Sequence, residues 1–467
     1  MMKTIIAGDI TVYEPSQEII DWCEENLILT NPVYTNLLRR GQQATIERKH
    51  VSPKIKCYSI RYGAYIIPYG CLRAIYPMVK GSEVTLNYAE DHHTAFGQMP
   101  CAVDLFDYQK EAVEKMLEAK GGILKAGCGS GKTYIGIEML RRLGLRFLWL
   151  CGKTDLLNQT LGNFKKLYPD LDVGTITDGE VNMGKDGTIS TVQTLVNVDY
   201  RLYENEFNVV IVDEVHLVTA NPATRQMYAK VLARCKAKYK YGLTATPARQ
   251  DGLVRLIYAH VGMSPRATFR PSFEIKDSKT QSLQSKYEAF ELDTPSSYSY
   301  LGLDGTIDFN ELLNYLQSND ERNLVLCEKI AQLQKNEHRK IAVLSYRKDH
   351  VYALESILKD MGIKCGSVTG KTSKKERKGI LSAPDDWDVI LSTVHLFKEG
   401  LDIKALDTVF IALPFKDAIG IQQSEGRAER PMDGKNEPLF VFAYDKNIPY
   451  CETVEKKMRR IVNRKRK

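Results

Sequence analysis

Residues 123–133, ILKAGCGSGKT, indicate the fold of the region around them. They follow the pattern G-x-x-x-x-G-K-[ST] of a phosphate-binding loop, with Ala126 at the first glycine position. The apolar run GGILKA before the loop predicts a buried strand, and TYIGIEMLRRL after it predicts a helix. The amides of such a loop and the helix N-terminus bind phosphate groups. The stretch therefore predicts an α/β nucleotide-binding domain.

The side chains of this loop predict how a nucleoside triphosphate is held. We expect Lys132 to contact the β- and γ-phosphates and Thr133 to bind Mg²⁺. Glycines allow the backbone to approach the phosphates closely. The predicted nucleotide-binding loop is made of Ala126, Gly127, Cys128, Gly129, Ser130, Gly131, Lys132 and Thr133.

Two carboxylates follow about eighty residues later, at the end of the apolar run VVIVDEVH. We expect Asp213 to bind Mg²⁺ and Glu214 to polarise the attacking water. A kinase would not require a water-activating glutamate at this place. The pair therefore favours a nucleotide hydrolase.

The segment QQSEGRAER, residues 422–430, supplies a third candidate element. Arg427 and Arg430 are three residues apart and would share one face of a helix. Such arginines stabilise the charge that develops as a γ-phosphate leaves. The alternative is a solvated basic face. In combination with the other two motifs, the segment indicates an arginine finger.

Short apolar runs divide most of the chain into two α/β units with parallel sheets. The first series is GGILKAG, RFLWLCG, TISTVQ, FNVVIVDE and KYGLTATP, and the second is KIAVLS, KCGSVTG, DVILST, TVFIAL and PLFVFAY. Residues 1–100 lack this rhythm and predict a separate, small α+β module. The predicted divisions are 1–100, 101–270, a linker over 271–308, 309–447 and a basic tail over 448–467.

Composition restricts the class of protein. Of the 467 residues, 43% are hydrophobic and 26% are charged, which is typical of a soluble globular protein. The ten cysteines are scattered, so no structural zinc site is expected. The sequence contains no run of about 18 apolar residues, so no membrane span is expected. We expect a reduced, cytoplasmic protein. The formal net charge of +7 is compatible with a polyanionic partner.

These motifs occur in an order that resembles the superfamily-two helicases. The series is FDYQKEA, AGCGSGKT, GKTDLLNQT, STVQTL, DEVH, GLTATPARQDG, VLSYRKDH, VTGKTSKKERK, STVHLFKEGLDI and QQSEGRAER, from about residue 104 to 445. The resemblance implies two tandem RecA-like domains, ATP bound between them, and nucleic acid across both.

The resemblance also implies a role for individual residues. Gln109 would read adenine, although Phe106 stands where a basic residue is common. His216, Thr244 and Thr246 would couple hydrolysis to movement, Gly400 and Asp402 would sense the nucleotide, and Gln423 would join the two arginines. The implied nucleic-acid contacts are Lys153, Gln159, Thr191 and Gln193 in the first domain, and Ser345, Gly370 and Thr393 in the second.

The kind of nucleic acid is indicated by DEVH and GLTATP, which look more like duplex-DNA translocases than RNA helicases with DEAD and SAT. The resemblance extends to phage recombination helicases of the UvsW kind and, more distantly, to the XPB and RecG types.

A basic stretch in the first hundred residues agrees in part. Residues 39–61 contain Arg39, Arg40, Arg48, Lys49, Lys54, Lys56 and Arg61, with Glu47 as the single acid. Tyr58, Tyr62 and Tyr65 lie close by and could stack on bases. A solvated basic face with core tyrosines is the alternative.

The sequence thus predicts an ATP- and Mg²⁺-dependent DNA helicase or translocase that acts on forks, R-loops or recombination junctions, in replication, recombination or repair. An RNA helicase is one alternative. A nucleotide-gated DNA-binding switch without strand separation is another.

Overall fold

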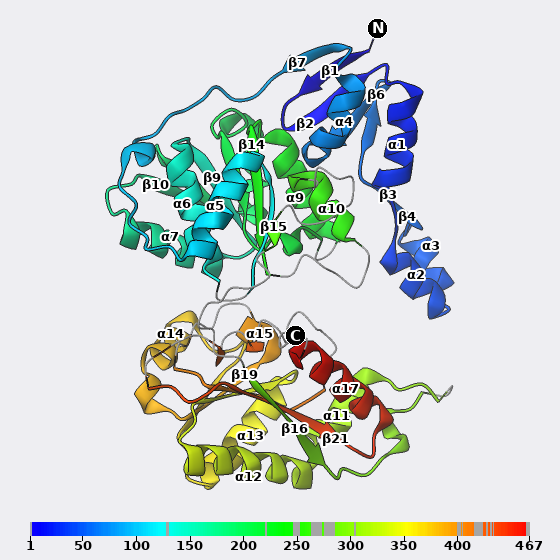
Figure 1. Cartoon of the computed structure of the whole chain (residues 1–467). Helices are drawn as coiled ribbons and strands as arrows, with labels where there is room; N and C mark the ends of the chain where they lie inside the picture. The colour runs from blue at the N-terminus through cyan, green and yellow to red at the C-terminus, as the bar shows by residue number, and fades with distance from the viewer. Residues whose placement is uncertain are drawn as a thin grey trace. The chain divides into compact units, whose positions relative to one another are not determined.

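The computed structural model describes residues 2–127, 130–219, 222–245, 253–262, 273–274, 285–302, 305–398, 403, 405–414, 424–425, 428–429, 432 and 434–463. The chain divides into two compact units, residues 1–278 and 279–467. Each unit contains a parallel α/β sheet (Figure 1). The predicted fold class, two α/β domains preceded by a small α+β domain, is confirmed.

The first unit begins with a five-stranded sheet in the order β5-β6-β2-β1-β7. Only the pairing of β1 with β7 is parallel. Helices α1 and α4 contribute Ile19, Cys23, Ile75 and Val79 to its core. Its elements are β1 (Lys3–Ile6), β2 (Asp9–Tyr13), α1 (Gln17–Leu27), β5 (Ser59–Arg61), β6 (Ala64–Pro68), α4 (Leu72–Val79) and β7 (Glu83–Leu86).

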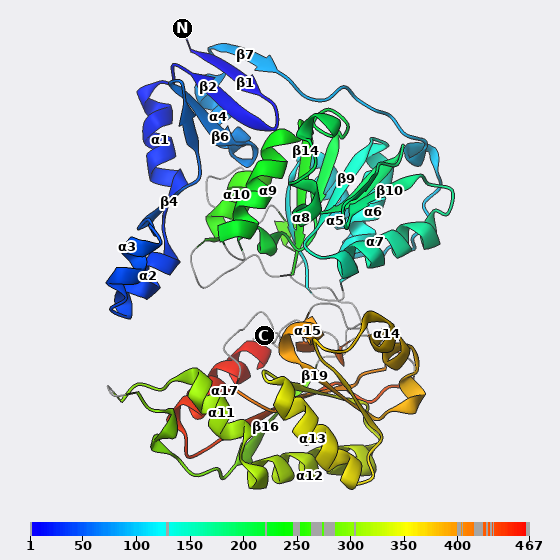
Figure 2. The same ribbon diagram turned by 180° about the vertical axis from the view of Figure 1, so that it is seen from behind.

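Two short helices stand apart from this sheet (Figures 1 and 2). They are α2 (Pro32–Arg39) and α3 (Gln43–Arg48), and the antiparallel strands β3 (Ile28–Thr30) and β4 (Lys54–Lys56) connect them to it. Asn31 caps α2 by accepting a hydrogen bond from the Val33 amide. Helix α2 buries no residue and α3 buries only Ile46. The helix pair is therefore held mainly by local bonds and exposes most of its side chains.

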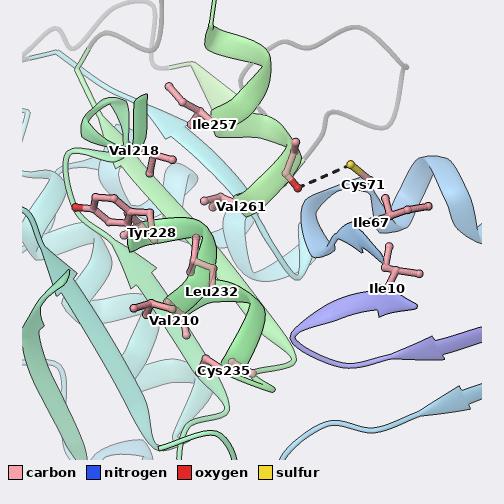
Figure 3. Packing of buried hydrophobic residues seen from close by; sticks show 14 of the residues in the cluster. Ile10, Ile67, Cys71, Val210, Val218, Tyr228, Leu232, Cys235, Ile257 and Val261 are labelled. Atoms are coloured by element: carbon pink, nitrogen blue, oxygen red, sulfur yellow. Dashed lines mark hydrogen bonds between the residues drawn. The ribbon is translucent and has the colours of Figure 1, made fainter. Parts of the chain in front are cut away.

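The small sheet packs directly on the first α/β domain, which corrects the prediction of a separate module. Its apolar residues belong to the same core cluster as the strands and helices of that domain. Figure 3 shows Cys71 facing α10 (Val254–Val261), with its thiol 3.8 Å from the Ala259 carbonyl oxygen, and Ile10 and Ile67 close to it on the side of the small sheet. A Cβ built on Gly70 would lie 2.3 Å from the Tyr258 carbonyl oxygen, so the backbones touch at this position.

A buried lysine makes a further connection across this junction. The Lys240 ammonium group donates to the carbonyl oxygens of Gly8, at 2.6 Å, and Leu232, at 2.7 Å, and lies over the Tyr69 ring. Burial lowers the pKa of Lys240 to about 8, and burial raises the pKa of the neighbouring Asp9 to about 6. Because the contact with Gly8 joins segments 232 residues apart, the sequence pattern did not reveal it.

The first α/β domain is an eight-stranded sheet in the order β11-β10-β12-β9-β13-β14-β8-β15. All pairings are parallel except that of β10 with β11. The five strands predicted here are confirmed as β8 (Gly122–Lys125), β9 (Phe147–Cys151), β12 (Gly187–Thr191), β13 (Val209–Val212) and β14 (Tyr239–Thr244). Further strands, not predicted, are β10 (Val173–Thr177), β11 (Glu180–Asn182) and β15 (Phe273–Glu274). The helices are α5 (Asp107–Ala119), α6 (Lys132–Leu143), α7 (Thr154–Leu167), α8 (Val192–Leu195), α9 (Pro222–Arg234) and α10 (Val254–Val261).

The second unit has a six-stranded parallel sheet in the order β16-β21-β20-β17-β19-β18. The five predicted strands are confirmed as β17 (Ile341–Ser345), β18 (Cys365–Val368), β19 (Val389–Thr393), β20 (Thr408–Ile411) and β21 (Leu439–Asp445). The helices include α11 (Phe309–Gln317), α12 (Asp320–Glu337), α13 (Lys348–Asp360), α14 (Lys374–Ser382), α15 (Val394–Lys398) and α17 (Pro449–Asn463).

Two predicted boundaries in this unit are wrong. The predicted linker, 271–308, contains β16 (Lys286–Leu292), an edge strand that pairs with β21 and is polar because most of its residues are half-exposed or exposed. The predicted basic tail, 448–467, forms helix α17 up to Asn463. Val454, Met458 and Val462 of α17 are buried against the sheet, at the four-residue spacing of one helix face.

Candidate nucleotide and nucleic-acid site

The phosphate-binding loop connects the end of β8 to the start of α6, as predicted. Gly131 precedes the helix with φ 73°, a left-handed conformation that glycine adopts without strain. The Ser130 hydroxyl donates to the Gly127 carbonyl oxygen at 2.8 Å. The Lys132 ammonium group donates to the carbonyl oxygens of Ala126 and Gly127, both at 3.2 Å. Thr133 lies in the first turn of α6. The loop thus places its lysine over its own backbone.

Gln109 ties helix α5 to this loop. Its side chain is buried, its Nε2 donates to the Ser130 carbonyl oxygen at 2.9 Å, and its Oε1 accepts from the Phe106 amide at 3.0 Å. The Tyr108 hydroxyl donates to the same Ser130 oxygen at 3.2 Å. Phe106 is 62% exposed and stacks on the Tyr108 ring. Gln109 therefore positions the loop, and its reading of adenine stays a prediction.

Asp213 lies directly after β13, at the carboxyl end of the central strands. Its backbone amide donates to the Leu150 carbonyl oxygen at 2.9 Å, and its Oδ1 accepts from the Glu214 amide at 2.9 Å. Burial, and then the charge of Glu214, raises the pKa of Asp213 to about 6, while Lys132 opposes this rise. The buried Asp213 carboxylate, which feels the charge of Lys132, offers an oxygen ligand of the kind that Mg²⁺ prefers.

Glu214, His216 and Thr244 form a connected group beside Asp213. Glu214 has φ 45°, and its Oε2 lies 3.1 Å from His216 Nδ1. The same nitrogen lies 3.1 Å from the Thr244 hydroxyl, at the end of β14. The Thr244 carbonyl oxygen accepts from the Ala126 amide at 3.0 Å. Contacts therefore run without a break from the predicted water-activating residue to the phosphate-binding loop.

The predicted nucleic-acid residues of this domain lie just after β9 and at the end of β12, and β9 lies between β12 and β13 in the sheet. Lys153 precedes α7, Gln159 is exposed on α7, and exposed Gln193 donates to the Gly152 carbonyl oxygen at 2.9 Å. Thr191 is buried, with its hydroxyl 3.0 Å from that of Thr194. The contact of Thr191 with nucleic acid stays a prediction.

Three predicted contacts in the second unit lie at the carboxyl ends of neighbouring strands β17, β19 and β18. Gly370 is exposed and Thr393 is half-buried. Ser345 is 1% exposed, and its hydroxyl lies 2.9 Å from His350 Nδ1 and accepts from the Arg347 amide at 3.2 Å. The Ser345 hydroxyl is therefore bonded inside the protein, and its contact with nucleic acid stays a prediction.

His350 is a positioning residue that the sequence did not reveal. Its Nε2 lies 2.9 Å from Asn323 Oδ1, and the Asn323 side-chain amide donates to the Gln317 carbonyl oxygen at 2.8 Å. Burial lowers the pKa of His350 to about 3, so the ring is neutral and can accept the Ser345 proton. The only sequence signal is a histidine five residues after a strand-ending serine.

The basic stretch in the first unit is presented to solvent. Arg39 and Arg40 end α2, Arg48 and Lys49 end α3, and all four are exposed. Within the described part of the chain, no ion pair neutralises them.

Two of the three tyrosines near these basic residues, unlike the arginines and lysines, are partly or fully covered by the protein. The Tyr58 ring is buried against Tyr65, with ring centroids 5.4 Å apart, and Lys56 lies over it. Burial of the Tyr58 ring leaves it unable to stack on a base, whereas Tyr65 is half-buried and its stacking on a base stays a prediction.

Some predicted site residues lie outside the described residues. They are Cys128, Gly129, Thr246, Gly400, Asp402, Gln423, Arg427 and Arg430. Two further searches were limited to the described part of the chain. There, no helix is both long and apolar enough to cross a membrane, and no cluster of three His, Cys, Asp or Glu side chains could hold a metal ion.

Known families match both α/β sheets. Residues 102–249 match the family described as type III restriction enzyme, res subunit, and residues 321–432 match the helicase conserved C-terminal domain. The chain is 26% identical over 343 residues to the putative ATP-dependent RNA helicase L396 of Acanthamoeba polyphaga mimivirus, covering 71% of this chain and 62% of the relative. It is 27% identical over 334 residues to the DNA 3'-5' translocase XPB2 of Sulfurisphaera tokodaii, covering 64% and 73%.

Among solved structures, the crystal structure of T4 UvsW matches 95% of this chain and 90% of that chain, with 17% identity and a TM-score of 0.41. The chain spans about half to two thirds of the length of the first curated relatives it matches. Two helicase domain families therefore follow one another on the two sheets that carry the motifs, in the order that the motifs predict. The chain belongs to the superfamily-two helicases.

Proposed function

We propose that this protein is an ATP-dependent DNA helicase or translocase that remodels branched DNA, such as forks, R-loops or recombination junctions. Its role would be in replication, recombination or repair. The reaction is ATP + H₂O → ADP + phosphate, coupled to movement along nucleic acid.

The chemistry of ATP hydrolysis rests on the carboxyl edge of the first sheet. Lys132 would bind the phosphates, and Asp213 and Thr133 would hold Mg²⁺, which would neutralise phosphate charge. Glu214 orients the attacking water, and its Oε2 lies 3.1 Å from His216 Nδ1. Because His216 also contacts Thr244, a change at the γ-phosphate reaches the end of β14 through two side-chain contacts.

The observation that carries the proposed nucleic-acid binding is the charge of the helix pair α2–α3 and its flanking strands, and the resemblance of DEVH and GLTATP to duplex-DNA translocases favours DNA. Residues 31–68 contain seven lysines and arginines and one glutamate, a formal charge of +6 in a chain whose total is +7. Phosphate contacts of this kind supply most of the affinity of nucleic-acid binding. The small sheet that carries them is fixed to the ATP-binding domain by Lys240 and Gly70. This arrangement supports a DNA-binding role for the helix pair α2–α3, which would move together with the ATP-binding domain.

An RNA helicase is the second candidate, because L396 carries that name. Exposed lysines and arginines bind either nucleic acid. A third candidate is a nucleotide-gated switch that binds DNA without separating its strands.

A substrate panel separates the three. ATP hydrolysis and strand displacement would be measured with forked DNA, a four-way junction, an R-loop, plain duplex, single-stranded RNA and no nucleic acid. We expect forked or junction DNA to stimulate hydrolysis most and to be converted to product. Stimulation by RNA alone would favour the second candidate, and hydrolysis without displacement on any substrate would favour the third.

A further inference from the structure

The tip of the β5–β6 hairpin holds an unusual residue. Strands β5 and β6 pair with Arg61 opposite Ala64, which leaves Tyr62 and Gly63 as a two-residue turn. Both turn residues have positive φ, 50° and 79°, as in a type I′ turn. Asparagine, aspartate and glycine are favoured in such turns, whereas a bulky side chain with positive φ is uncommon. Tyr62 therefore occupies a turn position at which asparagine, aspartate or glycine would be more favourable for folding.

The Tyr62 side chain makes no packing contact with the described residues that would compensate for this backbone conformation. It is fully exposed, at 106%, and has no ring contact or hydrogen bond within the described part of the chain. A Cβ built on neighbouring Gly63 would meet no atom within 4 Å, so the tip stands in open space. Backbone strain that no packing explains is commonly found at functional sites.

The surroundings of Tyr62 indicate the chemistry of a ligand. Arg61 beside it is exposed, and the segment 31–68 around it carries the +6 charge. Of the three tyrosines near the basic residues, Tyr58 and Tyr65 stack on each other, which leaves the faces of Tyr62 accessible. An exposed aromatic ring next to a phosphate-binding surface is the arrangement on which nucleobases stack.

We infer that Tyr62 stacks on the exposed face of a nucleobase at a DNA branch point. This inference rests on the proposed function and deepens it. Phosphate contacts fix a protein on DNA but do not distinguish a fork from plain duplex. In an intact duplex, each base is covered on both faces by its neighbours, whereas a branch point leaves one face uncovered. The Tyr62 ring would therefore distinguish branched DNA from plain duplex, which the basic residues cannot do.

Three chains test this assignment: the full-length wild type, Tyr62→Asn and Tyr62→Phe. Asparagine suits a left-handed turn and removes the ring, and phenylalanine keeps the ring and removes only the hydroxyl. Affinity would be measured for a forked duplex and for relaxed closed-circular DNA, which has neither ends nor branches. A 2-aminopurine base at the fork reports stacking by its fluorescence.

We expect Tyr62→Asn to weaken fork binding roughly five- to hundred-fold, the range for loss of one stacked base. Binding of closed-circular DNA, basal ATP hydrolysis and the melting temperature should be unchanged, or the melting temperature should rise. Tyr62→Phe should resemble the wild type in all of these and in the 2-aminopurine signal.

Three results would overturn the inference while leaving the proposed function intact. They are wild-type fork affinity in Tyr62→Asn, an equal loss on both DNAs, or a loss in Tyr62→Phe as large as in Tyr62→Asn. A wild-type protein that bound fork and closed circle equally, without DNA-stimulated hydrolysis, would overturn both.

Discussion

His216 Nδ1 lies 3.1 Å from the Thr244 hydroxyl, so that the segment after β13 is joined to the last residue of the neighbouring strand β14 by one side-chain contact. The same nitrogen lies 3.1 Å from the carboxylate of Glu214. The His216 imidazole thus lies between Glu214, the predicted water-activating residue, and Thr244 at the end of β14. This geometry is a direct route by which hydrolysis can be coupled to movement.

Thr244→Val should uncouple hydrolysis from unwinding. Valine keeps the volume of the buried side chain and removes the hydroxyl that contacts His216. We expect ATP hydrolysis to persist while duplex displaced per ATP falls roughly five- to hundred-fold, the range for one buried hydrogen bond. The control is Thr188→Val, at a buried threonine of β12 whose hydroxyl has no partner among the described residues. Equal displacement per ATP in Thr244→Val and wild type would exclude this coupling route.

Glu214→Gln should bind ATP and DNA but hydrolyse ATP very slowly. The amide preserves the shape of the side chain and leaves Asp213 to hold Mg²⁺, but it cannot activate water. Loss of such a group lowers the rate by about two to four orders of magnitude. Single-turnover hydrolysis and nucleotide binding would be compared with Lys132→Ala, which should lose nucleotide binding itself. Near-normal turnover in Glu214→Gln would place the base elsewhere.

Arg427→Ala and Arg430→Ala should each lower kcat far more than they raise the KM for ATP. The family motif assigns these residues to charge that develops only in the transition state, so ground-state binding depends on them little. Steady-state kinetics with saturating DNA would check this, with the exposed Arg460 of α17 changed to alanine as the control. A variant in which only KM changed would lose its assignment as an arginine finger.

The buried Lys240 should make stability depend on pH. Its pKa in the folded protein, about 8, lies below the ordinary value of 10.5. The buried charge therefore destabilises the fold below pH 8, and this destabilisation is relieved as the pH rises from 8 to 10.5. Other groups titrate in the same range, so the difference between wild type and Lys240→Met isolates the effect. We expect the melting temperature of the wild type, relative to the variant, to rise between pH 8 and 10. A constant difference would show that Lys240 titrates at its ordinary pKa.

The sequence was a good guide wherever one segment determines its own structure. The strands buried in the two sheets are continuous apolar runs, and the loop before Lys132 has a fixed pattern of glycines, so both were predictable. Strand β16 was not, because it lies at the edge of its sheet and most of its residues remain partly exposed. A short edge strand of mixed polarity resembles a linker.

The sequence was a poor guide to contacts between distant segments. Lys240 bonds to Gly8 across 232 residues, and nothing in either segment indicates the other. The tyrosines near the basic residues could not be told apart, because ring stacking of Tyr58 on Tyr65 depends on how β5 and β6 pair. The sequence also does not show that His350 binds the Ser345 hydroxyl.

The central claim is that the exposed basic residues of the helix pair α2–α3 bind DNA phosphates. Its most direct test is the salt dependence of binding to a forked duplex by the combined variant Arg39→Ala, Arg40→Ala, Arg48→Ala and Lys49→Ala. The slope of log K against log salt should become shallower by about 0.9 for each phosphate that the variant no longer neutralises, with ATP affinity unchanged. The control is Lys165→Ala with Lys166→Ala, two exposed lysines in the last turn of α7, at the far end of that helix from Lys153. We predict an unchanged slope for the control and a shallower slope with weaker fork binding for the combined variant. An unchanged slope and unchanged fork affinity in the combined variant would contradict the claim.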